Sequence, residues 1–146
     1  MRKTVLIIAV SAAIAVSLAF AAGSPQLFKQ KDLKTWDRND VAGGTGTLYG
    51  KFSFTRNDAK KSDTIKEIGW MTLKPGASIG MHKHTVNEDA YIIVSGEGEF
   101  IGDDGKVIKV KDGDITIARV GQSHALKNTG KTDLIFLDIV AQDSEK

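Results

Sequence analysis

After residue 45 the chain consists of short β-type segments separated by Gly, Asn and Asp, and this pattern restricts the fold more than any other feature. No helical period follows Asp40. Asp103-Asp104-Gly105 and residues 111–114 predict turns between segments. The predicted strands are 47–55, 64–73, 78–84, 90–94, 98–101, 106–110, 115–119, 124–128 and 134–141. So many short strands predict an all-β antiparallel sandwich or barrel, formed by one domain at residues 46–146.

The first residues have the pattern of an export signal. Arg2 and Lys3 precede an apolar run at residues 5–18, and Ala19-Phe20-Ala21 has the small-x-small form of a signal-peptidase site. We therefore predict a signal peptide at residues 1–21, cleaved after Ala21, and a periplasmic or secreted protein. An uncleaved N-terminal anchor is the alternative, since it differs from a signal only in length and flanking residues.

Residues 22–45 are polar and show no sustained period, so we expect an irregular N-terminal arm with a short helical turn at about 31–36. Such an arm could extend the sheet of a partner chain. Exposed sheet edges also favour pairing, so a homodimer is a reasonable expectation.

The charge balance argues against a polyanionic partner. The full chain has 20 basic and 18 acidic residues, and removal of Arg2 and Lys3 leaves 18 of each. A mature chain without net charge lacks the one-signed surface that binds nucleic acid or anionic membranes. We therefore expect a small-molecule ligand, no nucleic acid, and no membrane association after signal cleavage.

The sequence contains no cysteine. An exported domain of this size must then rely on its hydrophobic core or on partner chains rather than on disulfides. Thiolate catalysis and thiolate metal sites are excluded as well, so any metal must be held by imidazole and carboxylate groups.

The three histidines are the residues best suited to such a site. His82 and His84 stand two apart in a predicted strand, which places both imidazoles on one face. A carboxylate, Glu88 or Asp89, follows shortly after, and His124 comes directly after a predicted turn. Three imidazoles and one carboxylate suit a single divalent Fe, Mn, Ni, Cu or Zn ion and leave one or two positions open.

Two spaced motifs contain these residues, and through them residues 68–140 resemble the cupin superfamily, specifically its small single-domain members. The first motif is Gly76, five residues, His82-Lys83-His84, four residues, Asp89, six residues, Gly96. The second is Gly113, five residues, Arg119-Val120-Gly121, two residues, His124, three residues, Asn128. The resemblance implies a double-sheet jelly-roll barrel with a metal toward one mouth, turns at Gly96 and Gly121, and Asn128 fixing the barrel edge.

The chain departs from the motifs in two places. Arg119 occupies a position that is usually Pro, and its guanidinium could either clamp an anionic substrate or point to solvent. The motif spacing selects Asp89 as the carboxylate, whereas the usual residue type, Glu, selects Glu88. Neighbours in a strand face opposite ways, so one of the two must point outward. We slightly favour Glu88, on reach and residue type, and keep both as candidates.

Further residues could line a substrate pocket, namely Tyr91, Trp70 and Met71, although such side chains more often fill a core. The resemblance implies either a mononuclear metalloenzyme or a module that binds a small molecule or metal without turnover. Dioxygenases, decarboxylases, isomerases and lyases all occur among cupins. The sequence does not select one of them, since the same barrel hosts many functions.

Overall fold

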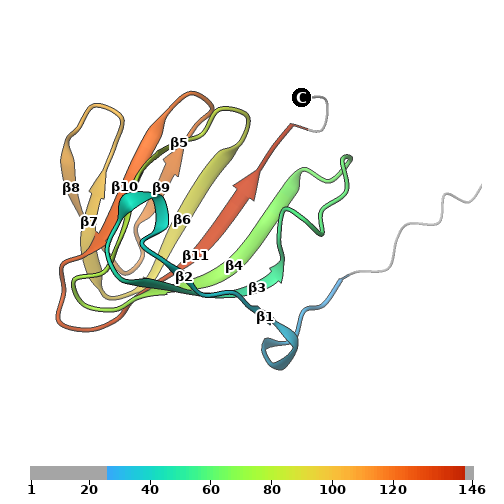
Figure 1. The fold of residues 1–146 in the computed structure, drawn as a ribbon, viewed down its shortest axis with the longest axis horizontal. Coiled ribbons are helices and arrows are strands. Elements are labelled where there is room, and N and C mark those ends of the chain that lie inside the picture. The colour runs from blue at the N-terminus through green and yellow to red at the C-terminus, as the bar shows by residue number, and fades with distance from the viewer. Residues whose placement is uncertain (1–25, 144–146) are drawn as a thin grey trace, which may run out of the picture.

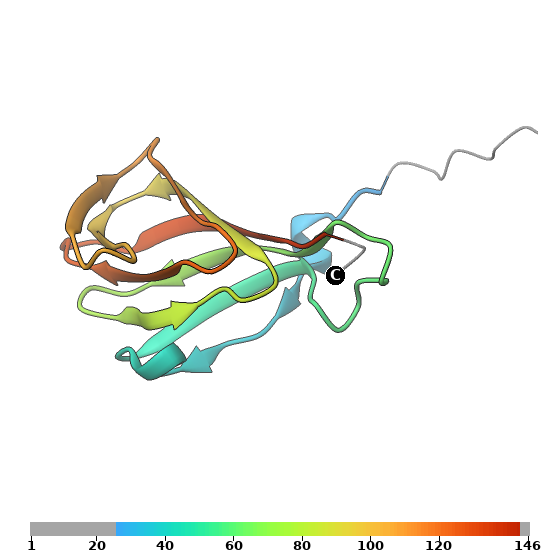
Figure 2. The same cartoon turned by 90° about the horizontal axis from the view of Figure 1, so that it is seen from above.

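The computed structural model describes residues 26–143, so the predicted export signal at residues 1–21 lies outside the described part. Two antiparallel sheets face each other and together form the barrel (Figures 1 and 2). No helix within residues 26–143 is long and apolar enough to cross a membrane.

The larger sheet has seven strands in the order β1-β3-β4-β11-β6-β9, with β2 also paired to β3. Its strands are β1 (Lys34–Thr35), β2 (Arg38–Asn39), β3 (Thr47–Phe54), β4 (Ile65–Leu73), β6 (Glu88–Ser95), β9 (Ile115–Ala118) and β11 (Leu134–Ala141). The smaller sheet has the order β5-β10-β7-β8. Its strands are β5 (Ser78–Lys83), β7 (Glu97–Ile101), β8 (Val107–Lys111) and β10 (Ser123–Asn128).

Each segment predicted as a strand is a strand in the structure, with ends that differ by no more than two residues. The agreement follows from the turn residues, which set where each strand stops. At Gly121 the backbone adopts φ +89°, a conformation that glycine reaches without steric cost. The predicted all-β, two-sheet antiparallel fold is confirmed.

The N-terminal arm is more ordered than the sequence predicted. A single 3-10 turn, η1 (Gln30–Asp32), replaces the helical turn expected at about 31–36, and a second, η2 (Val41–Gly43), follows β2. β1 and β2 pair with β3 of the same chain, at the side of the molecule away from β7 and β8 (Figure 1). Such two-residue ladders use backbone groups alone, so they leave no side-chain pattern to read.

The arm also lies directly against β5. A Cβ atom on Gly44 would come within 2.2 Å of the Ser78 carbonyl oxygen, and one on Gly80 within 2.1 Å of the Ala42 carbonyl oxygen. Thr45 and Ser78 form a β-bridge at the same place. Only glycine permits this backbone-to-backbone approach, which covers the edge of the smaller sheet.

The hydrophobic core fills the space between the two sheets. Its fully buried side chains come from both of them and include Phe52, Met71, Leu126, Leu134 and Phe136. Asn128 closes one end of this core: its Nδ2 donates to the carbonyl oxygens of Leu73 and Thr132, both at 2.8 Å. The side chain thereby fastens the turn between β10 and β11.

Candidate metal centre

The three histidines project from neighbouring strands of the smaller sheet. His82 lies on β5, with His84 just beyond the strand, and the register places His124 of β10 directly opposite His82. Asp89 lies on β6 of the larger sheet and points inward. Both sheets therefore contribute to one cluster inside the barrel.

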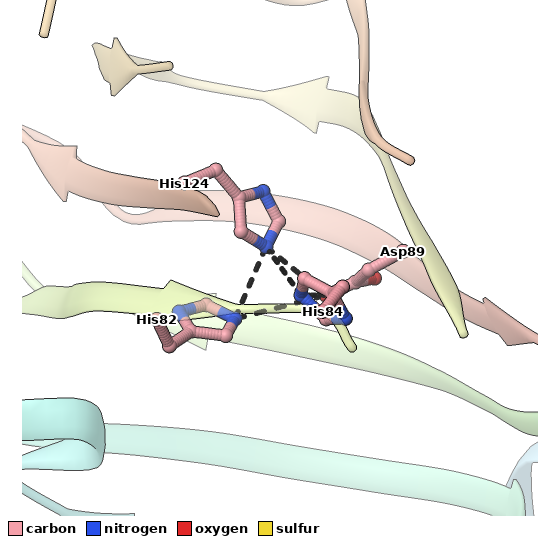
Figure 3. Close-up of side chains that lie close together, drawn as sticks. All are labelled: His82, His84, Asp89 and His124. Carbon is pink, nitrogen blue, oxygen red and sulfur yellow. Dashed lines mark hydrogen bonds and ion pairs between the residues drawn. The ribbon is translucent and has the colours of Figure 1, made fainter. Parts of the chain in front are cut away.

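The side chains of the cluster converge through one atom each (Figure 3). The Nε2 atom of His124 lies 3.0 Å from Nε2 of His84 and 3.1 Å from Nε2 of His82. Oδ2 of Asp89 lies 3.3 Å, 3.5 Å and 4.0 Å from the Nε2 atoms of His124, His84 and His82. All four donor atoms lie within 4.8 Å of one another.

Hydrogen bonds from the Nδ1 atoms of His82 and His84 decide whether their Nε2 atoms face the cluster as lone pairs or as N–H groups. Nδ1 of His82 donates to the carbonyl oxygen of Gly80 at 2.9 Å, and Nδ1 of His84 donates to Oδ1 of Asn87 at 2.8 Å. With the proton on Nδ1, each of these rings turns an Nε2 lone pair toward the cluster.

Converging lone pairs repel one another unless a cation lies between them, so the arrangement fits a metal ion. Ligand atoms about 2.1 Å from one ion lie roughly 3.0–3.4 Å apart in octahedral or tetrahedral geometry. Most separations in the cluster fall in or close to this range. Imidazole and carboxylate groups without thiolate suit Fe, Mn, Ni, Cu or Zn.

The cluster is mostly closed to solvent. His84, Asp89 and His124 are at most 3% exposed, whereas the His82 side chain is 27% exposed and marks the open side. Burial lowers the pKa of His82, and the other two imidazoles lower it further, which favours the neutral ring that binds metal. Burial opposes ionisation of Asp89, but hydrogen bonding to His124 and Asp138 holds the pKa of Asp89 below its usual value.

A second buried carboxyl group, Asp138, lies behind Asp89, and sequence reasoning did not select it. Asp138 is 7% exposed and stands opposite Tyr91 in the β11–β6 ladder. Burial raises the pKa of Asp138 well above its usual value, and the Asp89 charge, a hydrogen bond with Asp89 and then Glu67 raise it further. A lone carboxylate in the apolar run 134–141 was the signal that could have identified it.

Aromatic rings form the inner wall of the cluster. Tyr91 stacks on His124 with ring centroids 4.8 Å apart and an interplanar angle of 22°, and Phe100 meets the same imidazole edge-on at 5.7 Å. Of the side chains considered for a substrate pocket, Tyr91 is the one in contact with a histidine of the cluster.

The structure corrects the preference for Glu88. Asp89, Tyr91 and Ile93 face the interior, so Glu88 points away from the histidines and its Oε2 accepts a 2.6 Å hydrogen bond from Nη1 of Arg119. The two side chains form an exposed ion pair. Of the two alternatives for Arg119, the structure shows the second: its guanidinium faces solvent and does not point into the cluster.

Two other pocket candidates also lie elsewhere. Trp70 is 45% exposed on the outer face of the larger sheet, and Met71 is fully buried in the core. Alternation along β4 explains both positions, because neighbouring side chains of one strand must face opposite sides.

Comparisons with known proteins identify the part of the chain that contains the cluster. A family model described as a cupin domain matches residues 69–140. An oxalate-binding protein of Thermotoga maritima is 46% identical over 70 residues, which are 48% of this chain and 57% of the relative. The xanthan biosynthesis protein XanB of Xanthomonas campestris is 32% identical over 73 residues, which are 50% of this chain and 15% of the relative. The chain thus matches less than two thirds of either relative.

Among solved structures, the fold resembles a predicted oxalate decarboxylase from Thermotoga maritima. The TM-score is 0.72 at 29% sequence identity, and the match covers 81% of this chain and 100% of that protein.

Proposed function

This chain belongs to the cupin superfamily, and from that premise we propose that it binds one divalent transition metal and, through it, a small carboxylate anion such as oxalate. His82, His84, Asp89 and His124 would hold the ion. The observation that carries the proposal is the convergence of three imidazole nitrogens and one carboxylate oxygen in a buried cluster.

Charge at the cluster favours an anionic ligand. A divalent ion with one carboxylate and neutral imidazoles leaves a net positive charge in the barrel, which an anion can neutralise. The bound metal would supply a Lewis-acid centre with open positions for carboxylate oxygens.

The relatives narrow the class of anion. The Thermotoga protein that is 46% identical over 70 residues is named for oxalate binding, and the similar solved structure is described as a predicted oxalate decarboxylase. A compact dicarboxylate suits a site that is open mainly on the His82 side.

The test has two steps. Elemental analysis of protein dialysed without chelator should find close to one metal per chain, and calorimetry should then detect oxalate binding only with metal present. Lys83→Ala is the matched control, since Lys83 stands between the two ligating histidines and is exposed. A metal-free protein whose melting temperature does not rise with Mn, Fe, Ni or Zn contradicts the proposal.

Decarboxylation is a second candidate function, favoured by the similar solved structure that is described as a predicted oxalate decarboxylase. Cleavage of hydrogen oxalate to CO₂ and formate moves the acid proton to the carbon that loses CO₂. Formate release from oxalate by the metal-loaded protein would assign the enzyme. Oxalate binding without formate release would instead show that the protein binds oxalate and does not cleave it.

We further propose that the protein functions outside the cytoplasm, on the strength of Arg2 and Lys3, the apolar run 5–18 and the Ala19-Phe20-Ala21 pattern. Protein recovered from the periplasm or medium should begin at Ala22 by mass spectrometry. Full-length protein retained in the cell membrane would instead support the anchor.

A further inference from the structure

Arg38 is a cation of the N-terminal arm that points into the barrel. It lies on β2 directly opposite Leu48 of β3, and Leu48 is buried in the core. Residues directly opposite each other in an antiparallel pair share one face of the sheet, so the Arg38 side chain starts on the inner face. Its neighbour on β2, Asn39, is exposed. The guanidinium of Arg38 is thus directed inward, whereas that of Arg119 faces solvent.

Two aromatic rings hold the guanidinium of Arg38. Its Cζ atom lies 4.5 Å from the centroid of the Trp36 ring and 5.7 Å from that of the Phe52 ring. Phe52 is fully buried, and a Cβ atom on Gly69 would come within 2.7 Å of its ring, so the ring lies against the sheet where Gly69 has no side chain. A planar guanidinium that stacks on rings keeps its N–H groups in a fixed orientation.

The half-buried charge of Arg38 has no counter-ion. Within residues 26–143 it forms no ion pair, and its buried Nε atom has no hydrogen-bond partner. The two other arginines of this part of the chain, Arg56 and Arg119, pair with Glu67 and Glu88. A buried charge without a partner is unfavourable, so an anion that reaches Arg38 should be bound tightly.

The arm brings Arg38 to the open side of the histidine cluster. β2 pairs with β3 of the larger sheet, and a few residues later the Ala42 carbonyl lies against Gly80 of β5. The arm therefore crosses from one sheet to the other at this side of the barrel (Figure 2). The carbonyl oxygen of Gly80 accepts the hydrogen bond from Nδ1 of His82, the cluster residue that is open to solvent.

The charge of Arg38 also acts on side chains beside the cluster. Burial raises the pKa of Tyr91 and of Asp138, and the Arg38 charge opposes both rises. Tyr91 stacks on His124 of the cluster. Because the interaction between charges weakens with distance, the guanidinium lies within electrostatic reach of the metal centre.

We propose that Arg38 is the anion-binding residue of this site, whose guanidinium hydrogen-bonds a carboxylate group of the ligand at the metal centre. This role rests on the proposed function and adds to it the residue that selects dicarboxylates. Oxalate can place oxygens on a metal ion and still present oxygens to a guanidinium. Acetate has no second carboxylate group to offer. Arg38 thereby takes the part that the sequence suggested for Arg119.

The experiment measures oxalate and acetate binding by calorimetry, with protein that carries the metal it retains on dialysis. Arg38→Met should lower the oxalate affinity roughly 10–100-fold, because hydrogen bonds between charged groups are lost. The acetate affinity should change little. Arg119→Gln removes the same charge at the surface and is the matched control, so it should bind both anions as wild type does.

Two further measurements separate anion binding from folding. Arg38→Met should bind metal as wild type does in chelator competition. Without ligand it should melt no lower, because it loses an unpaired charge and keeps an unbranched side chain against the two rings. Arg38→Lys keeps the charge but not the two-pronged geometry, so it should recover part of the oxalate affinity.

The outcomes distinguish this role from the proposed function. Unchanged oxalate affinity in Arg38→Met overturns the role of Arg38 and leaves the proposed function in place. Equal losses for oxalate and acetate, or a loss of metal, would also overturn it, since Arg38 would then only support the structure. A wild type that binds metal but no oxalate overturns both.

Discussion

Around the histidine cluster, the two faces of the seven-stranded sheet differ from what burial alone would select. On β6 and β11 the inward positions include Asp89, Tyr91 and Asp138, whereas the outward ones include Ile92 and Leu137. Polar groups lie inside at the cluster, and aliphatic groups lie outside. Neither arrangement stabilises an isolated barrel, because buried carboxyl groups and exposed apolar surface are both unfavourable.

Buried polar groups and exposed apolar groups both mark places where a binding partner would stabilise the protein. On the inner face, the Nε2 atoms of the three histidines and Oδ2 of Asp89 converge on one point. On the outer face, Phe28 and Leu33 of the arm line a groove with Trp70 and Leu137, whereas Ile115 of β9 remains 69% exposed. The converging donor atoms lie inside the barrel and Ile115 lies outside it, so changes on one face should leave the other unaffected.

The largest expected effect comes from removing an inner ligand. His124→Ala should lower the metal affinity by more than about 100-fold, because it removes the buried imidazole whose Nε2 lies nearest both other histidines. Competition with a chelator measures this. The outer variant Ile115→Lys should bind metal as wild type does. If it loses metal as well, the two faces are not independent.

Asp89→Asn and Glu88→Gln test which neighbouring carboxylate belongs to the inner face. Asp89→Asn should weaken metal binding by roughly 10–100-fold, because it removes the only anionic ligand of the cluster. Glu88→Gln should change metal affinity little, since it breaks only the exposed pair with Arg119. The reverse result would restore Glu88 as the ligand.

Asp138→Leu should weaken metal binding by about 10-fold, because the change removes the hydrogen bond that Asp138 makes to Asp89. Asp138→Asn can still donate that bond and should recover most of the affinity. Equal losses in the two variants, measured by the same chelator competition, would show that Asp138 only fills space.

The smallest expected effect is on acid stability and comes from the solvent-exposed pair of Lys34 and Asp58, which lies on neither face. A hydrogen bond from Lys34, followed by others from Thr55, lowers the pKa of Asp58 to about 2. Its stabilising effect is therefore present above pH 3.8 and is lost as the pH falls toward 2. Asp58→Asn should remove this small dependence from acid unfolding followed by circular dichroism. An unchanged acid profile would show that the pair contributes nothing.

The sequence predicted the strands and the three histidines because both depend on short-range rules. Turn residues bounded each strand, and the i, i+2 spacing placed His82 and His84 on one side. His124 was found through its spaced motif. None of these inferences required knowledge of which strands pair.

The choice between Glu88 and Asp89 failed for a physical reason. Glu88 was favoured on reach and residue type, and neither of these reports which way the strand faces. In the structure Asp89, Tyr91 and Ile93 face the interior, and Ala90, Ile92 and Val94 face outward. A strand with apolar residues on both sides cannot reveal its orientation from its own composition, and its partners β11 and β9 decide it.

The close contact between the arm and β5 has a consequence for how the protein opens. The chain at Gly44 touches β5 at Ser78, four residues before His82. The Ser78 amide donates to the Thr45 carbonyl oxygen at 2.8 Å, so its hydrogen should exchange with solvent only when the arm detaches. A protease cut in the arm would then speed metal release without changing any metal-binding residue. The arm would therefore help to set how long a metal ion stays bound.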